Sequence, residues 1–259
     1  MNFILSFLNK IGLATLHYIE EAGCMVILFF DAVRWAFVPP LRAKRIFKQM
    51  EFIGVKSVFI VVLTGTFTGM VMALQTYHGF RLFSAESLVG STVALAITRE
   101  LGPVLTALMV TARAGSAMAA ELGTMRVTEQ IDALSVMATN PTKYLVVPRI
   151  VACVITLPLL TVLADITGVL GSYFVAGKLL GIDGGVFTAN IIKYVELGDI
   201  YNGLFKAMCF GLLMGTISCY KGLSTRGGAE GVGRATTESV VLSSVTILVS
   251  DYFLTALMF

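Results

Sequence analysis

The sequence predicts an all-α integral membrane protein, and its composition and apolar segments are the observations behind this prediction. Hydrophobic residues make up 56% of the 259 residues and charged residues only 14%, about half the charged share of a soluble protein. The mean hydropathy of +0.85 leaves too little charge to cover a water-exposed surface. Several apolar segments are long enough to cross the hydrocarbon layer, and the alternating segments of a membrane barrel are missing. Lipid offers no partner to an exposed backbone, so these segments must be helices.

Charge and cysteine usage exclude other classes of protein. The net charge is only +3 and the Lys and Arg residues are dispersed, which does not fit a nucleic-acid-binding surface. The four cysteines lie in apolar stretches without a CxxC motif or a histidine at metal-ligand spacing, so they are expected to be small core residues. No charged head precedes the first apolar segment, and we therefore expect no cleaved signal peptide.

Residues 1–50 are expected to lie at the membrane surface rather than across the bilayer. Apolar side chains recur there at helical spacing opposite polar ones, at Phe3, Phe7, Ile11, Ala14 and Tyr18. Asp31 and Arg34 interrupt the apolar stretch that follows, although a sixth span over residues 22–38 remains the alternative. Pro39 and Pro40 end this helix, and the basic residues after them suit an anionic membrane surface.

Five spans are expected in residues 51–259. The first, residues 57–80, contains no Asp, Glu, Lys or Arg, whereas the others tolerate one or two charges. These others are residues 87–112, 150–177, 200–220 and 239–259. The connections on one side of the membrane hold 13 Lys and Arg residues and those on the other side hold 3. By the positive-inside rule the N-terminus is expected in the cytoplasm and the C-terminus outside.

Charged residues inside these spans are the candidate functional residues. Each ionised group costs about 2.5 to 3.5 kcal/mol in the bilayer, so Arg99 and Glu100 are expected to face the bundle interior. Steps of seven along the second span give a polar stripe of Thr92, Arg99, Thr106 and Arg113. The third and fifth spans offer similar faces that contain Asp165 and Asp251, so three spans are expected to share a polar interior.

These charges allow different interpretations. In the first, Arg99 pairs with Glu100 or with Asp251 and only fixes the packing of the helices. In the second, Arg99 or Lys206 meets the anionic head group of an amphiphile whose acyl chains lie among apolar side chains, which fits a phospholipid. An intramembrane aspartyl protease built on Asp165 and Asp251 is a third hypothesis, but the glycine-rich surroundings of such proteases are missing.

The connection between the second and third spans is too polar for the bilayer and is expected to form an amphipathic helix over residues 128–139. Thr128 is expected to cap it, with Glu129 and Asp132 near its start, and Asn140 to end it. Such a helix either packs back on the bundle or docks into another protein. Because no glycine-rich segment has phosphate-loop spacing, we do not expect this chain to hydrolyse ATP or to hold a cofactor or metal of its own.

Long sequence segments carry a resemblance to one family. They are TRELGPVLTALMVTARAGSAMAAELGTMRVTEQIDALSVMATNP at 98–141, GTFTGMVMALQ at 65–75, PLLT at 158–161, GVGRATTESVV at 231–241 and DYFLTALMF at 251–259. These segments closely resemble the MlaE family, the permease subunits of lipid-transporting ABC systems that maintain outer-membrane lipid asymmetry. The resemblance covers nearly everything after the N-terminal helix.

The resemblance implies a homodimer of five-span permeases in the bacterial inner membrane, each preceded by an interfacial elbow helix. It also implies partners: two ABC ATPase subunits that bind ATP and magnesium, periplasmic MCE-domain lipid-binding proteins and, as in the best-known members, a small STAS-domain subunit. The helix at 128–139 would be the coupling helix in the ATPase groove, with contacts from Arg126, Glu129, Gln130, Asp132 and Leu134.

The implied function is ATP-driven transport of phospholipid between the inner and outer membranes, by alternating access to a cavity at the dimer interface. Arg99 and Glu100 would border that cavity and Gln75 would line it, and the buried-charge argument adds Lys206 and Asp251 to the lipid-binding set. A stand-alone channel or secondary carrier for a small amphiphile is the alternative. Neither the direction of transport nor the head-group preference follows from the residues.

Overall fold

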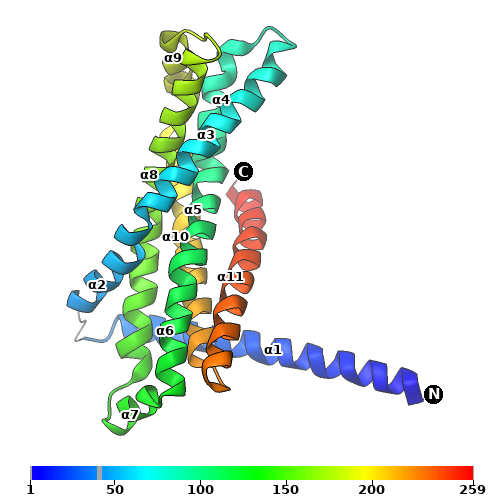
Figure 1. The fold of residues 1–259 in the computed structure, drawn as a ribbon, viewed down its shortest axis with the longest axis vertical. Coiled ribbons are helices and arrows are strands. Elements are labelled where there is room, and N and C mark those ends of the chain that lie inside the picture. Colours follow the sequence, from blue (N-terminus) through cyan, green and yellow to red (C-terminus); the bar gives the residue numbers. More distant parts are fainter. Residues whose placement is uncertain (1, 40–42, 259) are drawn as a thin grey trace.

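Long helices run along the axis of the molecule, and α1 lies across them near one end (Figure 1). The computed structural model describes residues 2–39 and 43–258, without the side chains of residues 2–11, 14, 17 and 18. No strand occurs in these ranges. The α-helices are α1 Asn2–Ala36, α2 Ala43–Ile53, α3 Val58–Arg81, α4 Val89–Ala96, α5 Gly102–Val110, α6 Ser116–Val127, α7 Gln130–Val136, α8 Val147–Lys178, α9 Gly184–Tyr194, α10 Leu197–Leu223 and α11 Gly228–Met258.

The five predicted spans are confirmed. In the described ranges, five helical segments are long and apolar enough to cross a membrane: Ala43–Arg81, Glu86–Val127, Thr142–Lys178, Leu197–Leu223 and Gly228–Met258. The segments are longer than the predicted spans because several helices continue past the apolar stretch. α1 is not among the five, although it has 35 residues. The sixth span at residues 22–38 is therefore not supported.

α1 and α2 form the region that was predicted to lie at the membrane surface. On α1, Ala32 is buried in an apolar cluster with residues of α6 and α8, and Trp35 packs against this cluster. The side chains on the predicted apolar side of the amphipathic helix, Phe3, Phe7, Ile11, Ala14 and Tyr18, lie outside the described residues. On α2, Ile53 is buried, and Phe47 on the same helix is exposed. Both helices therefore keep apolar side chains outside the bundle as well as inside it.

Short π-helical turns occur within the second membrane segment and at the start of the third. They span Ile97–Leu101, Thr111–Gly115 and Thr142–Val146. A π turn inserts a residue into the helix and rotates the faces that follow it. Arg99 and Arg113, predicted on one stripe, lie 14 residues apart and reach different neighbours. Arg113 donates to the carbonyl oxygen of Phe52 at 2.6 Å, whereas Arg99 pairs with a residue of α10.

α3 and α8 approach each other closely at Gly65 and Gly69, and the four-residue spacing of these glycines permits such a contact. A Cβ at Gly69 would collide with the backbone carbonyl of Gly168, so Gly69 leaves no room for a larger residue. Behind this contact lies the main core, in which Leu157 of α8 and Phe210 of α10 are completely buried. α8 packs against α3, α10, α2 and α5, and α10 packs against α8, α11, α6 and α5, so these two helices form the centre of the bundle.

We expect Gly69→Ala to lower the free energy of unfolding by about 1 to 3 kcal/mol, because the added methyl group separates α3 from α8. Thermal unfolding of the purified protein in detergent measures this change. Gly79→Ala is the matched control on the same helix, where a Cβ meets open space. That control should be neutral or stabilising by up to about 1 kcal/mol, since alanine is the better helix former. Equal stability of the two variants would contradict the close contact.

Candidate functional site

A single lysine joins three helical segments at the candidate site. Lys206 of α10 is completely buried, and its Nζ donates to Glu100 Oε2 at 2.7 Å and to Asp251 Oδ1 at 3.2 Å. The same ammonium donates to Thr255 Oγ1 at 2.6 Å and to the Arg99 carbonyl oxygen at 3.2 Å. Thr255 in turn donates to Glu100 Oε1 at 3.1 Å. We call Lys206, Glu100, Asp251 and Thr255 the Lys206 cluster.

A second ion pair lies beside this cluster. Arg99 Nη2 is 2.6 Å from Asp199 Oδ1, and its Nε donates to the same oxygen at 2.7 Å. The Asp199 side chain is only 6% exposed, and its other oxygen accepts the backbone N–H of Glu196 at 3.0 Å. Asp199 therefore completes the capping box at the start of α10 and also holds Arg99.

Accessibility divides these charged side chains into two kinds. The Lys206 side chain has no exposed surface, whereas Arg99 is 37% and Glu100 is 36% exposed. Both residues belong to a segment that crosses the membrane. Charges at that depth are not stable against lipid, so the exposed part of Glu100 requires a polar ligand, water or another protein surface. The site can therefore bind a polar group from outside while Lys206 stays in place.

The structure corrects the partners that were expected from the sequence. Arg99 pairs with Asp199 rather than with Glu100 or Asp251, and the ion pairs of Glu100 and Asp251 are with Lys206. Asp199 was not among the candidate residues. Its capping-box position, three residues after Glu196, marks the start of a helix but does not reveal a partner 100 residues away in the sequence.

Two other candidates lie apart from the cluster. Gln75 is exposed on α3 and makes no hydrogen bond with the described residues. Asp165 of α8 lies against Gly102, and its Oδ1 has no hydrogen-bond partner in the described part of the chain. Asp251 is bound by Lys206 instead, so the structure does not assemble the pair of carboxyl groups that the protease hypothesis requires.

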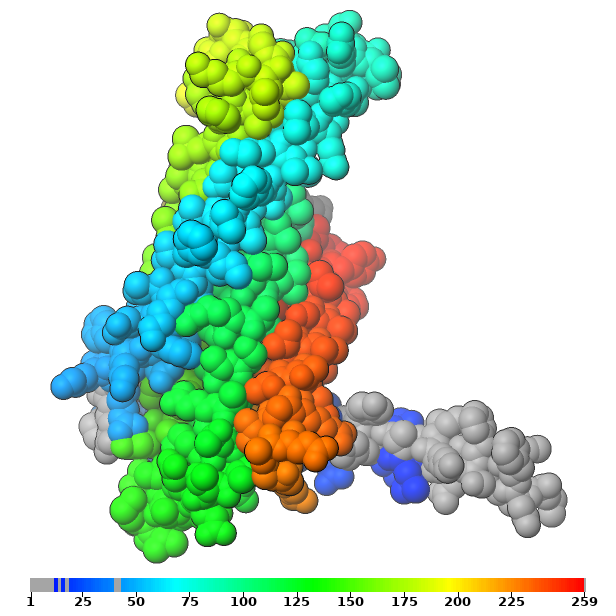
Figure 2. All heavy atoms as spheres, in the orientation of Figure 1, coloured from blue at the N-terminus to red at the C-terminus, as the bar shows by residue number. Residues whose placement is uncertain are grey.

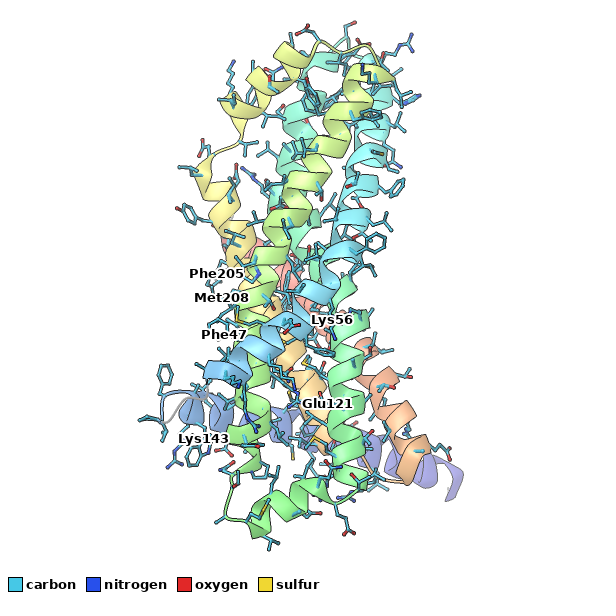
Figure 3. The ribbon with its side chains drawn as sticks, turned by 60° about the vertical axis from the view of Figure 1, so that its left-hand side comes forward. Phe47, Lys56, Glu121, Lys143, Phe205 and Met208 are labelled. Atoms are coloured by element: carbon cyan, nitrogen blue, oxygen red, sulfur yellow. The ribbon has the colours of Figure 1, made fainter. Side chains whose placement is uncertain are left out.

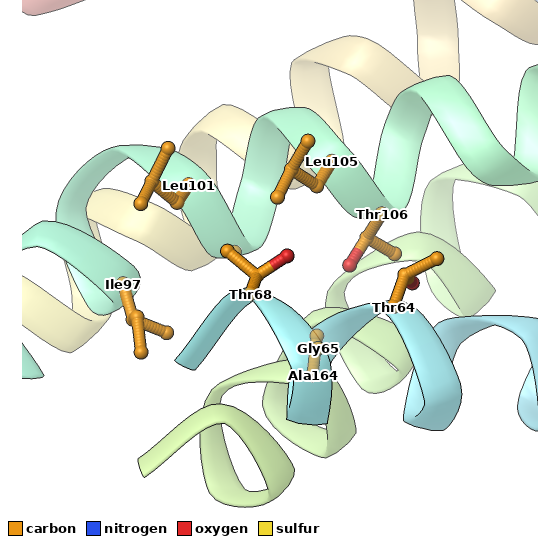
Figure 4. A pocket seen from close by; sticks show the side chains of 9 residues that line it. Thr64, Gly65, Thr68, Ile97, Leu101, Leu105, Thr106 and Ala164 are labelled. Carbon is orange, nitrogen blue, oxygen red and sulfur yellow. The ribbon is translucent and has the colours of Figure 1, made fainter. Parts of the chain in front are cut away.

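The space where α3, α5 and α8 meet is too small for a lipid. Figure 4 shows this cavity, which has a volume of about 10 Å³ and is lined by Thr64, Thr68 and Thr106 among others. This volume holds at most one water molecule. The predicted polar interior shared by three spans does not form a large cavity where α3, α5 and α8 meet. The charged side chains that remain accessible are those of Arg99 and Glu100.

The predicted cytoplasmic helix is present as α7, but it is shorter than residues 128–139. Glu129 has a φ of +60°, a left-handed conformation that separates α7 from α6. Thr128 does not cap α7, because its hydroxyl donates to the Thr124 carbonyl oxygen at 2.8 Å. Asn140 also has a different role, since its side-chain oxygen accepts the backbone N–H of Thr142 at 2.9 Å.

α7 is attached to the bundle on one side and exposed on the other. Ile131 is buried in an apolar cluster that also contains Leu145 and Val146, and Leu134 packs against this cluster. Asp132 forms an ion pair of 2.6 Å with Arg126, and both side chains are exposed, as are Glu129 and Gln130. Val136 at the end of the helix is 88% exposed. This exposed end of α7 is suited to contact another protein.

The five membrane-crossing segments and the charges at bilayer depth define a multi-pass membrane protein with a polar site in its membrane region. The family model described as "Permease MlaE" matches residues 46–257. The chain belongs to the MlaE permease family.

Curated relatives extend this assignment over almost the whole chain. A probable ABC transporter permease of Rickettsia felis is 45% identical over 99% of both chains. A probable ABC transporter permease of Synechocystis is 43% identical over 82% of this chain and 81% of its own. The intermembrane phospholipid transport system permease MlaE of Haemophilus influenzae is 38% identical over 99% of this chain and 98% of its own. The chain is thus an ABC transporter permease of this family.

We expect Lys206→Met to lower the free energy of unfolding by about 3 to 5 kcal/mol, because it leaves Glu100 and Asp251 without their cation. The triple variant that also carries Glu100→Gln and Asp251→Asn should recover part of this loss. Unfolding in mixed detergent micelles measures both. Lys178→Met, at an exposed lysine, is the control and should change stability by less than about 0.5 kcal/mol. A similar loss in this control would contradict the structural role of Lys206.

Proposed function

We propose that this ABC transporter permease moves phospholipid between the inner and outer membranes. The observation on which the proposal depends is the pair of partly exposed charges, Arg99 and Glu100, at bilayer depth beside the buried Lys206. A phospholipid supplies a polar group for these charges and acyl chains for the apolar surface around them. The name of the Haemophilus influenzae relative, 38% identical to this chain, supports phospholipid as the substrate class.

In this proposal Arg99 meets the lipid phosphate and Lys206 keeps the site assembled. A guanidinium can form two parallel hydrogen bonds to a phosphate, and a second copy of the chain would cover the exposed face and close the cavity. Gln75 on α3 would line the wall of that cavity, and Glu100 and Asp251 would border it. No covalent chemistry occurs in this chain. The protein changes only which side of the membrane the cavity faces.

ATP hydrolysis, with its magnesium, would take place in separate ATPase subunits that press on α7. The exposed side chains of Glu129, Gln130 and Asp132 and the exposed Val136 favour this contact. Arg126 holds Asp132 and would keep α7 aligned with α6, so that a push on α7 reaches the second membrane segment. Leu134 would transmit the push to the apolar cluster beneath.

The proposed assembly is a homodimer in the bacterial inner membrane, with α7 in the cytoplasm. The excess of Lys and Arg in the connections on that side supports this orientation, with the N-terminus inside and the C-terminus in the periplasm. α1 would be the elbow helix at the membrane surface. Periplasmic MCE-domain proteins would exchange lipid with the dimer, and a STAS-domain subunit would bind the ATPase.

The lipid proposal predicts that Arg99→Ala combined with Asp199→Asn retains about tenfold less phospholipid, since a charge-assisted hydrogen bond contributes about 1.5 to 3 kcal/mol. The second substitution prevents the loss of Arg99 from leaving a buried unpaired carboxylate. Mass spectrometry of the gently solubilised assembly measures bound lipid and, in the same spectrum, the presence of an ATPase partner.

Asp199→Asn alone is the control and should retain lipid, because Arg99 remains. Normal lipid retention in the double variant would instead favour a purely structural role for these charges. Transport by the lone chain without ATP or an ATPase partner would favour a channel or a secondary carrier and would overturn the proposal.

The coupling proposal predicts that Glu129→Lys with Asp132→Lys lowers ATP-driven lipid transport at least tenfold, while the permease still inserts. Reversed charges would meet the partner surface with the wrong sign, and repulsion between like charges weakens docking. Transport into acceptor vesicles and stimulation of ATPase activity are the measurements. Glu230→Lys, a reversal at an exposed residue of α11, is the control and should transport normally. Unchanged transport in the α7 variant would contradict the coupling role.

A further inference from the structure

A second cavity lies between α2, α6 and α8, away from the Lys206 cluster. Its volume is about 270 Å³, far more than one water molecule needs. Its polar lining consists of Arg45, Lys48, Gln49, Glu121, Tyr144 and Arg149. We call it the basic cavity. Neither the Lys206 cluster nor α7 contributes to it.

Two buried polar atoms of this lining have no hydrogen-bond partner in the described residues: Arg149 Nε and Gln49 Oε1. Arg149 is only 3% exposed, and its two terminal nitrogens bind the Leu145 carbonyl oxygen and Glu121, each at 2.8 Å. Both residues line the same cavity, so a small shift of the two side chains would present one unpartnered donor and one unpartnered acceptor to its interior. Buried groups without partners are costly, which indicates that a ligand with both an acceptor and a donor completes them.

The charge of the lining specifies an anion. Arg45, Lys48 and Arg149 outnumber the one carboxylate, Glu121, by two. Arg149 is neutralised by Glu121, but Lys48 has no ion pair with any described residue. The Arg45 guanidinium stacks 3.3 Å from the Tyr144 ring centroid and donates to the Tyr144 carbonyl oxygen at 3.4 Å, which holds it beside the cavity. The positive charges of Arg45 and Lys48, which no carboxylate of the lining neutralises, suit a phosphate diester.

The cavity lies at the level where α1 crosses the bundle. Figure 3 places Glu121 and Lys143 at the height of α1, with Phe47 of α2 slightly above them. Trp35 near the end of α1 has the Lys143 ammonium 5.3 Å from its ring, an arrangement suited to the boundary between water and lipid. Phe47 is exposed on the same helix that supplies Lys48 and Gln49 to the cavity. A lipid head group can therefore enter the cavity while its acyl chains stay beside α2.

We propose that the basic cavity binds the phosphoglycerol head group of a membrane phospholipid. Lys48, Arg45 and Arg149 Nε hold the phosphate, and Gln49 Oε1 accepts a hydrogen bond from a glycerol hydroxyl. An ethanolamine head group fits less well, because its ammonium would enter a lining that is already positive. The lipid attaches the α2 end of the first membrane segment to α6 and α8, and this role does not depend on which lipid the permease transports.

Trp35 allows a direct test, because it is the only tryptophan in the chain and packs in the same apolar cluster as Tyr144 and Leu145. Brominated phosphatidylglycerol is titrated into nanodiscs of phosphatidylcholine that hold the full-length permease, and quenching of Trp35 is recorded. Lys48→Gln should raise the lipid fraction for half-quenching at least fivefold, because it removes a charge-assisted hydrogen bond to the phosphate. Lys44→Gln is the matched control, because it removes the same charge from the same helix outside the cavity. This control should change the lipid fraction for half-quenching less than twofold. Equal shifts would overturn the proposal, since they indicate general surface attraction.

A second comparison tests the role of Gln49. Phosphatidylmethanol has the charge of phosphatidylglycerol without its hydroxyl groups, so the native chain should prefer the glycerol lipid several-fold. Gln49→Leu should abolish this preference and leave binding of phosphatidylmethanol unchanged. The variant is expected to fold, because it removes an unpartnered buried acceptor. Retained preference in Gln49→Leu, or displacement of the lipid by millimolar free glycerol phosphate, would overturn the assignment to a lipid head group.

Discussion

The ammonium group of Lys206 is the interaction on which the membrane part of this fold depends. It is completely buried, and its partners come from the π turn of the second membrane segment and from α11. A lysine in hydrocarbon is stable only when acceptors surround it, so the cluster sets the register of three segments against one another. Arg99 extends this constraint, because its bond to Asp199 connects the same π turn to the start of α10.

Structural and accessible charges are separated within a few residues of sequence. Glu100 uses both carboxylate oxygens to hold Lys206 and Thr255, yet about a third of its side chain remains accessible. Arg99 is equally accessible although it is paired. A membrane bundle therefore keeps polar groups at its surface by attaching them to a buried partner, which lowers the cost of presenting charge to a ligand.

Local features of the fold could be predicted from the sequence, whereas the partners of the charged residues could not. The five spans follow from the length of apolar stretches, and the contact at Gly69 follows from small residues four positions apart. Asp199 and Arg99 are 100 residues apart, so only the packing of α10 brings them together. The π turns and the left-handed Glu129 have no compositional signal, so the turns were not predicted and α7 is shorter than expected. The two orphaned atoms of the basic cavity likewise depend on how α2 rests on α8.

The position of Lys206 in the chain has a consequence for biosynthesis. Its partner Glu100 emerges from the ribosome 106 residues earlier, but its second partner, Asp251, emerges 45 residues later. When α10 leaves the ribosome, the lysine therefore has only part of its final shell of acceptors. Because an incompletely solvated ammonium resists entry into hydrocarbon, α10 is expected to wait at the insertion machinery until α11 arrives, so that the last two helices enter the bilayer as a pair.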